Sequence, residues 1–495
     1  MKSGKIKNAT FTPLIHSLSQ DYVFVDNELQ NSIDQIGFWK IFHRHGVSSK
    51  RYGYGIHQIV FCLLISYFLR NSSICSFCIK CLSVFIAGGK DVIYDFLKRE
   101  DIKWRQISLS VAKKVYVQHD IPYNDSAFVV DDTIKQRSGK KVNGVSSHFD
   151  HTLGRCVMGQ QIIELGLSSP KGFIPLDRQI FIGKKKVHPL SSEFSDKRCA
   201  AARDYDTALN KTKHEMLEDM LKRVLNFGIK AKFLIGDSWF GCKKNISLAL
   251  LMELKGIFRM KRGKLKYTYE NKEYTLIELY CLFIEKRLRE KKLSKDLKWK
   301  TISLNVQLNL SEDKKKSNWV DLKLVFSSPK NPRKNEWAAF ICTDVDMVEE
   351  EILKAYALRW GVEVYFKEAK QNMGFLKEQT GNYVCHYASV NLTAIRYLLI
   401  FDSMLRRGTC SFGEIRNEIT GRLEMLTFAS LLWAFFKAII YGVLDQFSRT
   451  IGCDVLKKIK ETIKNTVEEI LEKALQLDEN YIKNEIKAER LGLLT

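Results

Sequence analysis

Three carboxylates that are far apart in the sequence have the residue type and the placement for metal-dependent chemistry. The apolar run Ala127–Val130 ends in the doublet Asp131-Asp132, and a second apolar run ends in Asp237. Short, β-branched apolar runs are typical of buried strands, so we expect these aspartates at the ends of neighbouring strands. Glu363 lies in a stretch with helical periodicity and supplies a third acid. Such oxygen ligands suit Mg²⁺, and two ions can assist an in-line displacement at phosphorus.

The stretch around Glu363 combines this acid with residues that could hold phosphate. A helix expected from about Met347 to Met373 would carry four of them: Tyr356, Arg359, Glu363 and Lys370. At about 100° per residue, these four lie within an arc of roughly 60° on one helix face. Arg359 and Lys370 could hold a phosphate-rich ligand while Glu363 reaches a metal. Taken alone, this pattern is more typical of a solvated face of mixed charge.

Together, these motifs resemble a large family of bacterial insertion-sequence DDE transposases, the YREK-signature family of the insertion-sequence-4 type. The pattern Tyr356-x2-Arg359-x3-Glu363-x6-Lys370 matches the four residues and the spacings of that signature. Asp132-Thr133 and the Gly-Asp-Ser-Trp-Phe-Gly segment at 236–241 resemble the family's first and second aspartate motifs. The similarity covers about residues 120–395 and includes the segments 139–145 and 159–161.

The resemblance implies an α/β fold: a ribonuclease-H-like catalytic core with a β-rich insertion before the glutamate. Asp132, Asp237 and Glu363 would bind two Mg²⁺ or Mn²⁺ ions. Asp131 and Asp132 are neighbours on a strand, so their side chains point to opposite faces and only one can meet the metals. We choose Asp132, because it matches the aspartate that precedes threonine in the family's motif.

The resemblance also implies a cut-and-paste reaction on double-stranded DNA. The ends of the element would be nicked, a hairpin would form and reopen, and the freed 3′-hydroxyls would attack target DNA. Tyr356, Arg359 and Lys370 would grip phosphates near the cleaved end, and Trp360 would pack beside a distorted base. In the family a dimer bridges two terminal inverted repeats, so we expect a homodimer.

The elements that must position these residues divide the chain into five predicted regions. They are a helical, DNA-binding N-terminal region (1–120), the first part of the core (121–255), a β-rich insertion (256–345), a catalytic helix completing the core (346–400) and a helical C-terminal region that could dimerise (401–495). The strands expected within them are 127–130, 156–167, 173–182, 232–236 and two alternating runs near 301–308 and 321–326. A helix over Leu217–Leu225 should end at Gly228.

The charge balance of the chain favours a polyanionic partner. The 495 residues include 79 Lys and Arg against 56 Asp and Glu, a formal net charge of +23. Such a protein binds nucleic acid through the release of counterions. The apolar runs Ile59–Leu69 and Leu426–Phe436 are shorter than the ~20 residues that span a bilayer, so we expect buried helices and no membrane contact. We therefore expect a cytoplasmic, nucleoid-associated bacterial protein without a signal peptide, whose 12 cysteines are reduced.

Several other sequence features are weaker evidence for function. The triplet Cys75, Cys78 and Cys81 lacks a fourth ligand nearby and is more typical of small core residues. The basic stretch 285–300 could contact phosphate or be a solvated surface. The candidates for stacking on an extruded base are the tryptophans of the insertion, Trp299, Trp319 and Trp337, among which the sequence does not choose.

Two other functions fit parts of the pattern. One is a nuclease with the same core that cuts DNA and no longer joins it. The other is a non-catalytic DNA-binding protein, such as an inhibitor of transposition. A pure binder has no need of converging carboxylates, which repel phosphate, so the three acids favour an enzyme.

Overall fold

The computed structural model describes residues 27–47, 54–86, 88–151, 153–291, 299–311, 313, 317–331, 333, 336–446 and 452–474. The chain forms two compact units. We call Glu100–Gln371 with Thr380–Leu398 the sheet unit, and Met1–Arg99, Asn372–Gln379 and Leu399–Thr495 the helical unit. All the predicted site residues lie in the sheet unit.

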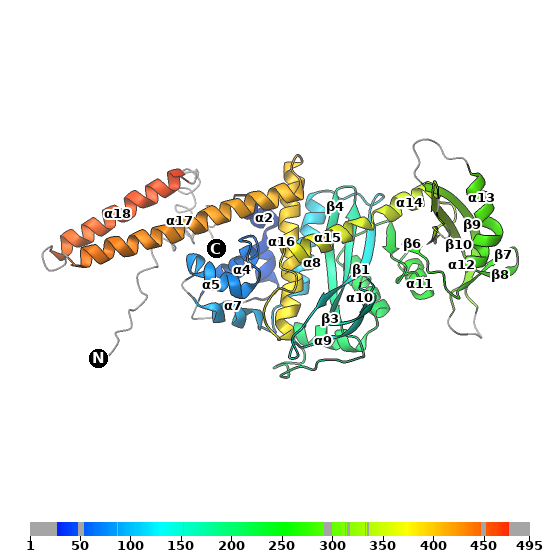
Figure 1. Ribbon diagram of the computed structural model, residues 1–495, viewed down its shortest axis with the longest axis horizontal. Coiled ribbons are helices and arrows are strands. Elements are labelled where there is room, and N and C mark those ends of the chain that lie inside the picture. Colours follow the sequence, from blue (N-terminus) through cyan, green and yellow to red (C-terminus); the bar gives the residue numbers. More distant parts are fainter. Residues whose placement is uncertain are drawn as a thin grey trace. The chain divides into compact units, whose positions relative to one another are not determined.

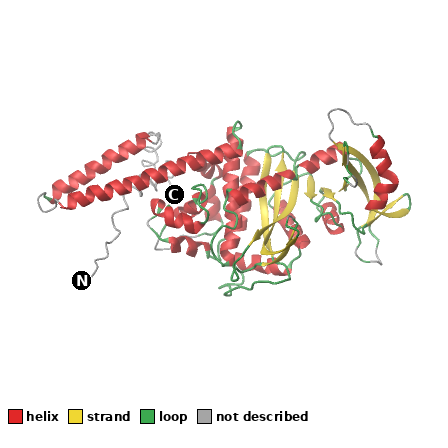
Figure 2. Cartoon of the chain, viewed as in Figure 1, coloured by secondary structure: helices red, strands yellow, loops and turns green. Residues whose placement is uncertain are grey.

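The sheet unit is built on one mixed sheet with helices packed on it (Figures 1 and 2). The strand order is β2-β3-β1-β5-β6-β11-β10-β9-β7-β8, and β4 pairs with β3. The strands are β1 (Ala127–Gln136), β2 (Ser146–Asp150), β3 (Arg155–Ser169), β4 (Gly172–Phe181), β5 (Phe233–Gly236), β6 (Lys255–Arg259), β7 (Lys266–Tyr269), β8 (Lys272–Thr275), β9 (Trp299–Asn309), β10 (Trp319–Pro329) and β11 (Ala338–Cys342). The predicted α/β class is confirmed.

Parallel pairing is concentrated at the centre of the sheet. β1 runs parallel to β5, and β5 runs parallel to β6, whereas β1 is antiparallel to β3. The apolar residues of β1 from Ala127 to Val130 and all of β5 are buried. Strands buried on both faces read as continuous apolar runs, which explains why the sequence predicted both. The alternating strands β9 and β10 also form where period-two patterns predicted them.

The helices of the sheet unit are α8 (Trp104–Gln118), α9 (Ala200–Asn210), α10 (Lys213–Asn226), α11 (Lys243–Leu251), α12 (Leu276–Leu279), the π-helix η2 (Tyr280–Ile284), α13 (Glu285–Glu290), α14 (Glu349–Ala357), α15 (Trp360–Gln371) and most of α16 (Tyr383–Arg407). α10 confirms the predicted helix. A capping box between Thr212 and Glu215 starts it, and Gly228 follows its end with a φ of 76°.

The catalytic helix predicted from Met347 to Met373 is two helices instead of one. The α-helical hydrogen-bond pattern is interrupted at Leu358 and Arg359, because their backbone N–H groups donate to carbonyls three residues earlier instead of four. This tighter turn separates α14, which packs on β6 and β9, from α15, which packs on β1, β3 and β4. Figure 1 shows α15 lying across these strands. The four signature residues are therefore distributed over α14, a turn and α15.

The helical unit contains α2 (Asn27–Ile36), α3 (Phe38–Arg44), α4 (Ile56–Ile65), α5 (Ile74–Lys80), α6 (Leu82–Phe85), α7 (Lys90–Leu97), the end of α16, α17 (Phe412–Gln446) and α18 (Cys453–Ala474). α4 is buried, as its apolar run predicted. The prediction of a buried helix at Leu426–Phe436 is wrong, because Phe428, Leu431 and Phe435 of α17 are exposed. Residues 475–495 of the predicted C-terminal region, and 292–298 of the basic stretch, lie outside the described residues.

One helix in the described part of the chain, α16, is long and apolar enough to cross a membrane. Its apolar window is completely buried within the protein. Packing against the rest of the chain therefore accounts for its composition.

Candidate active site

The pairing of β1 with its two neighbours decides which aspartate of the doublet faces which side. In the parallel ladder Val130 pairs with Gly236, so the following residues, Asp131 and Asp237, lie next to each other. Asp237 follows the last residue of β5, whereas β1 continues past Asp131 to Gln136, so the prediction that the first strand ends at the doublet is wrong. In the antiparallel ladder Asp131 lies opposite Glu164 of β3. Paired residues share a face of the sheet, so Asp131 and Glu164 point to the same side.

The helices on that side are identified by the partners of Glu164. Its carboxylate forms a buried ion pair with Arg178 of β4 at 3.0 Å. Arg178 also donates to Ser108 of α8 at 2.7 Å and to Asn391 of α16 at 3.0 Å. Asp131 therefore points to the face that α8 and α16 cover, which is also where Arg359, next to α15, reaches it.

Arg359 joins Asp131 to the glutamate of the signature. Its Nη1 donates to Asp131 Oδ2 at 3.2 Å, and its Nη2 donates to Glu363 Oε1. Burial and the nearby charge of Asp237 raise the pKa of Asp131 to about 7, against the opposing effect of Arg359. Asp237 is held by its own turn, since Oδ1 accepts from the backbone N–H groups of Trp239 and Phe240. Asp131 and Asp237 thus interact through their charges, and the Arg359 guanidinium joins Asp131 to Glu363.

Asp132, the residue that the sequence favoured as a metal ligand, points to the other face. Its Oδ2 accepts from Lys213 Nζ of α10 at 2.6 Å, and its Oδ1 accepts from Gln161 Nε2 of β3 at 2.7 Å. The doublet divides between two faces as strand geometry requires, and it is Asp131, not the predicted ligand Asp132, that lies beside Asp237 and Arg359. The motif match could not determine which side chain faces Asp237, because pairing between strands decides this.

A cavity of 650 Å³ opens beside these acids. Four carboxylates line it, those of Asp131, Asp132, Asp150 and Asp237, and so do three lysines, Lys213, Lys261 and Lys370. Lys370 of the signature lies close enough to Asp131 for their charges to interact. This mixture of acids that repel phosphate and cations that attract it suits a site holding both metal ions and a nucleic-acid backbone.

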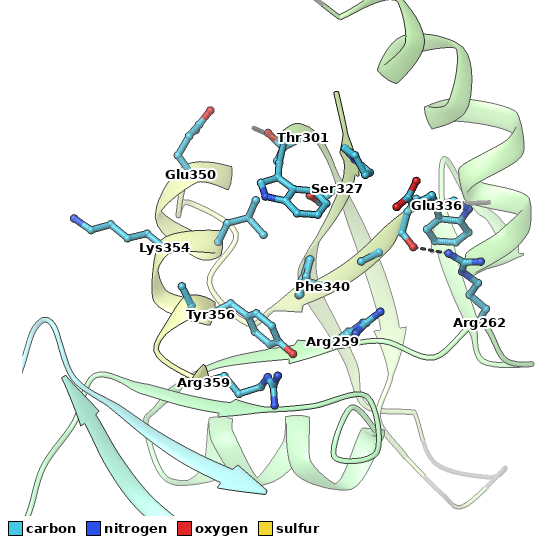
Figure 3. Close-up of a pocket in the computed structure, with 16 residues that line it drawn as sticks. Arg259, Arg262, Thr301, Ser327, Glu336, Phe340, Glu350, Lys354, Tyr356 and Arg359 are labelled. Carbon is cyan, nitrogen blue, oxygen red and sulfur yellow. Dashed lines mark hydrogen bonds between the residues drawn. The ribbon is translucent and has the colours of Figure 1, made fainter. Parts of the chain in front are cut away.

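A second cavity, of 790 Å³, lies between α14 and the strands β9, β10 and β11 (Figure 3). Tyr356 and Arg359 line it together with Arg259, Arg262 and Trp299. Burial raises the pKa of the Tyr356 hydroxyl to about 12, so it stays protonated and can donate a hydrogen bond. Arg359 therefore borders this cavity and also contacts Asp131 of the first.

The three insertion tryptophans have different surroundings. Trp337 is buried, stacks on Tyr280 with 4.1 Å between ring centroids, and has the Arg262 guanidinium 4.0 Å from its ring. Trp299 is 55% exposed and lines the second cavity, whereas Trp319 is 49% exposed and is not among the residues that line it. Trp360, predicted to pack beside a distorted base, is exposed and lines neither cavity.

The fit of this site to divalent cations depends on Asp131 and Asp237. Among the described residues, no group of three or more His, Cys, Asp or Glu side chains already has the arrangement of a metal site. The two aspartates nevertheless lie close enough for the charge of one to raise the pKa of the other. A cation between them would relieve that repulsion, and carboxylate oxygens are the ligands that Mg²⁺ and Mn²⁺ prefer. The donor set therefore fits, with Glu363 tied to it by Arg359.

Sequence reasoning missed the cations that complete this site. Lys213, Lys261, Arg259 and Arg262 carry no motif, and each lies near the acids or the second cavity only because of the fold. Lys213 was detectable only as the first residue of a helix, which says nothing about its partner.

Two family models match the chain. A DDE superfamily endonuclease model matches residues 79–268, which include Asp131 and Asp237, and a Transposase DDE domain model matches residues 191–383, which include Asp237 and Glu363. No curated protein matches the chain. The mixed sheet with its parallel centre is consistent with the ribonuclease-H-like core of such domains. The chain therefore carries DDE endonuclease and transposase domains, which support its assignment as a DDE transposase.

Proposed function

We propose that this protein moves an insertion sequence by cut-and-paste transposition, as a member of the YREK-signature family of the insertion-sequence-4 type. Its substrates would be the terminal inverted repeats of the element and a target duplex, in the bacterial cytoplasm at the nucleoid. The observation that carries the proposal is the bridge of Arg359 between Asp131 and Glu363, next to Asp237. It brings the signature helix to Asp131 of β1 and, beside it, Asp237 after β5.

Asp131, Asp237 and Glu363 would hold two Mg²⁺ or Mn²⁺ ions. When bound, these ions would activate the attacking oxygen and stabilise the leaving oxygen. The neighbouring residues act on the DNA. Arg359 neutralises Asp131 and Glu363 and has the planar fork that binds phosphate. Tyr356 offers a hydroxyl donor, and Lys370 offers a charge at the cavity.

The finer steps of the reaction, hairpin formation and strand transfer, require a distorted DNA end. The second cavity supports this step, because its volume and its exposed Trp299 suit an unstacked nucleotide. Arg259 and Arg262 line the same cavity and could bind the phosphates on either side. Trp299 is therefore the tryptophan that we favour for stacking.

The reaction itself can be tested with linear DNA that carries candidate terminal repeats, incubated with the full chain and Mn²⁺. Hairpin ends together with strand-transfer products support the transposase. Cuts without joining would support the nuclease, and a mobility shift without products would support the non-catalytic binder. The Asp237→Asn variant serves as the control for contaminating nucleases.

A homodimer would bring two element ends together, and α17 offers a surface for a second copy. Its exposed residues Met425, Phe428, Leu432, Phe435 and Ile439 follow heptad spacing and are 41–68% exposed. An apolar stripe with this spacing is typical of the contact surface between two helices. A contiguous exposed apolar patch of this kind commonly marks a protein–protein interface. Light scattering should give a dimer for the natural chain and a monomer for the Phe428→Glu/Phe435→Glu variant. The Arg422→Ala variant on the same helix should remain dimeric.

A further inference from the structure

Lys213, the first residue of α10, has an unusual setting for a lysine. Only 9% of its side chain is exposed, and its Nζ donates to Asp132 at 2.6 Å. The same ammonium lies 4.4 Å from the ring centroid of Trp239 and 5.3 Å from that of Phe181. The capping box of α10 fixes the backbone from which it projects. The charge is therefore held in one place by an acid and two aromatic faces.

A purely structural role does not explain this arrangement well. A buried ion pair contributes little net stability, because removing both charges from water costs about as much as their attraction returns. Here the pair also borders the 650 Å³ cavity that Asp131 and Asp237 line. A lysine ammonium has three donors, and Asp132 accepts one of them. The others can serve a ligand inside the cavity.

The chemistry of such a ligand follows from the charges around it. A phosphodiester entering this cavity would meet the carboxylates of Asp131 and Asp237, which repel it. Lys370 supplies compensating charge from α15, Lys261 supplies it from the segment after β6, and Lys213 supplies it from α10. Cations from separate elements would thus contact different oxygens of the same strand.

We propose that Lys213 is a phosphate-binding residue of the catalytic cavity and that Asp132 is the residue that positions it, not a metal ligand. The inference rests on the proposed action on DNA. The two members of the aspartate doublet would then have separate tasks: Asp131 at the metal ions and Asp132 at the lysine.

Binding measurements test the lysine without any requirement for cleavage. The affinity of the full chain for a fluorescein-labelled linear duplex is measured over a series of salt concentrations. Lys213→Met should make the dependence of log K on log salt shallower by about one, as expected for one lost phosphate contact. Lys213→Arg should restore the slope. Lys222→Met, on the same helix and paired with Glu218, is the matched control and should leave it unchanged. An unchanged slope in Lys213→Met would overturn the proposal.

Cleavage measurements test the role of Asp132. Asp132→Asn should retain metal-dependent cleavage at about a tenth of the natural rate, and adding it to Lys213→Met should cause little further loss, since the two residues act as one unit. Asp131→Asn should remove cleavage. Loss of all cleavage in Asp132→Asn, in a protein that melts normally, would make Asp132 a metal ligand and overturn the inference.

The outcomes separate this inference from the proposed function. A natural chain that binds DNA but never cleaves it would contradict the transposase, while the salt slope would still decide whether Lys213 binds phosphate. If Lys213→Met fails to fold because Asp132 is left unpaired, the Lys213→Met/Asp132→Asn variant has no unpaired charge and gives the same slope test.

Discussion

Arg359 donates to Asp131 Oδ2 at 3.2 Å and, through its other amino group, to Glu363. One guanidinium therefore connects the middle of a central strand to a helix more than two hundred residues later in the chain. Among the described residues, this is the hydrogen-bonded connection that joins Glu363 to the aspartates.

Removal of the proposed metal ligands should abolish chemistry while leaving the fold intact. Asp131→Asn, Asp237→Asn and Glu363→Gln should each lower metal-dependent nicking by more than the ~100-fold that loss of an outer-shell partner costs. The measurement is cleavage of linear DNA with Mn²⁺, with melting curves as the check on folding. Near-normal turnover by Asp131→Asn would remove it from the ligand set.

Replacement of Arg359 should expose the repulsion that it now neutralises. Arg359→Met leaves Asp131 and Glu363 without their shared counter-ion, so the metal-free protein should melt at a lower temperature. Mg²⁺ should raise that melting temperature more than it raises the natural protein's. Arg198→Met, which removes an exposed ion pair with Asp196, is the control and should change neither value. Equal stabilisation by Mg²⁺ in both proteins would argue against metal binding beside Arg359.

The stability of the metal-free protein should depend on pH through Asp131. Its folded-state pKa is about 7 and its ordinary value is 3.8, so the folded state favours the protonated form. The stability contributed by that proton is present at low pH and is lost as pH rises through about 7. Melting in EDTA should therefore fall between pH 5 and pH 8 more steeply for the natural chain than for Asp131→Asn. Burial also raises the pKa of Glu164 to about 7, and this effect is common to both proteins.

Lys370 should contribute to DNA binding and not to metal binding. Lys370→Ala should weaken binding to linear duplexes and make the salt dependence shallower by about one. Lys367, also exposed on α15 but outside the first cavity, supplies the control Lys367→Ala. Equal slopes for the two variants would show that Lys370 touches no phosphate.

Trp299 should stack on an unpaired base during end processing. Trp299→Ala should reduce hairpin formation by about tenfold, the loss of roughly 1–3 kcal/mol of stacking. Trp319→Ala, equally exposed but outside the cavity, should have little effect. The fluorescence of 2-aminopurine placed near the cleaved end reports the stacking directly, and no quenching difference between the variants would contradict it.

The parts of the fold that could be predicted from sequence are those whose patterns are local. β1, β5 and α10 form where continuous apolar runs or helical periodicity indicated them. The prediction of a single catalytic helix was wrong, because hydrophobic periodicity does not reveal the two backbone hydrogen bonds, from Leu358 and Arg359 to carbonyls three residues earlier, that separate α14 from α15. The apolar run in α17 was expected to be buried because hydrophobicity alone does not say what covers a helix.

The site was predictable as a set of residue types and only partly as an arrangement. Arg359 and Lys370 were expected to hold phosphate, and the structure places both beside Asp131. The choice of Asp132 over Asp131 needed the registers of β1 with β3 and β5, which are non-local. The pairing of Asp132 with Lys213 likewise depends on where α10 packs against the sheet.

The strands that line the second cavity belong to the same hydrogen-bonded sheet as the strand that delivers Asp237. β5 pairs with β6, β6 with β11, β11 with β10, and β10 with β9, which begins at Trp299. A continuous hydrogen-bonded sheet resists stretching, so it holds the distance between the acids and the second cavity constant. A DNA end that engages both, as the proposed function requires, would meet them at this set separation, and the energy for any bending or unstacking needed to fit would have to come from binding.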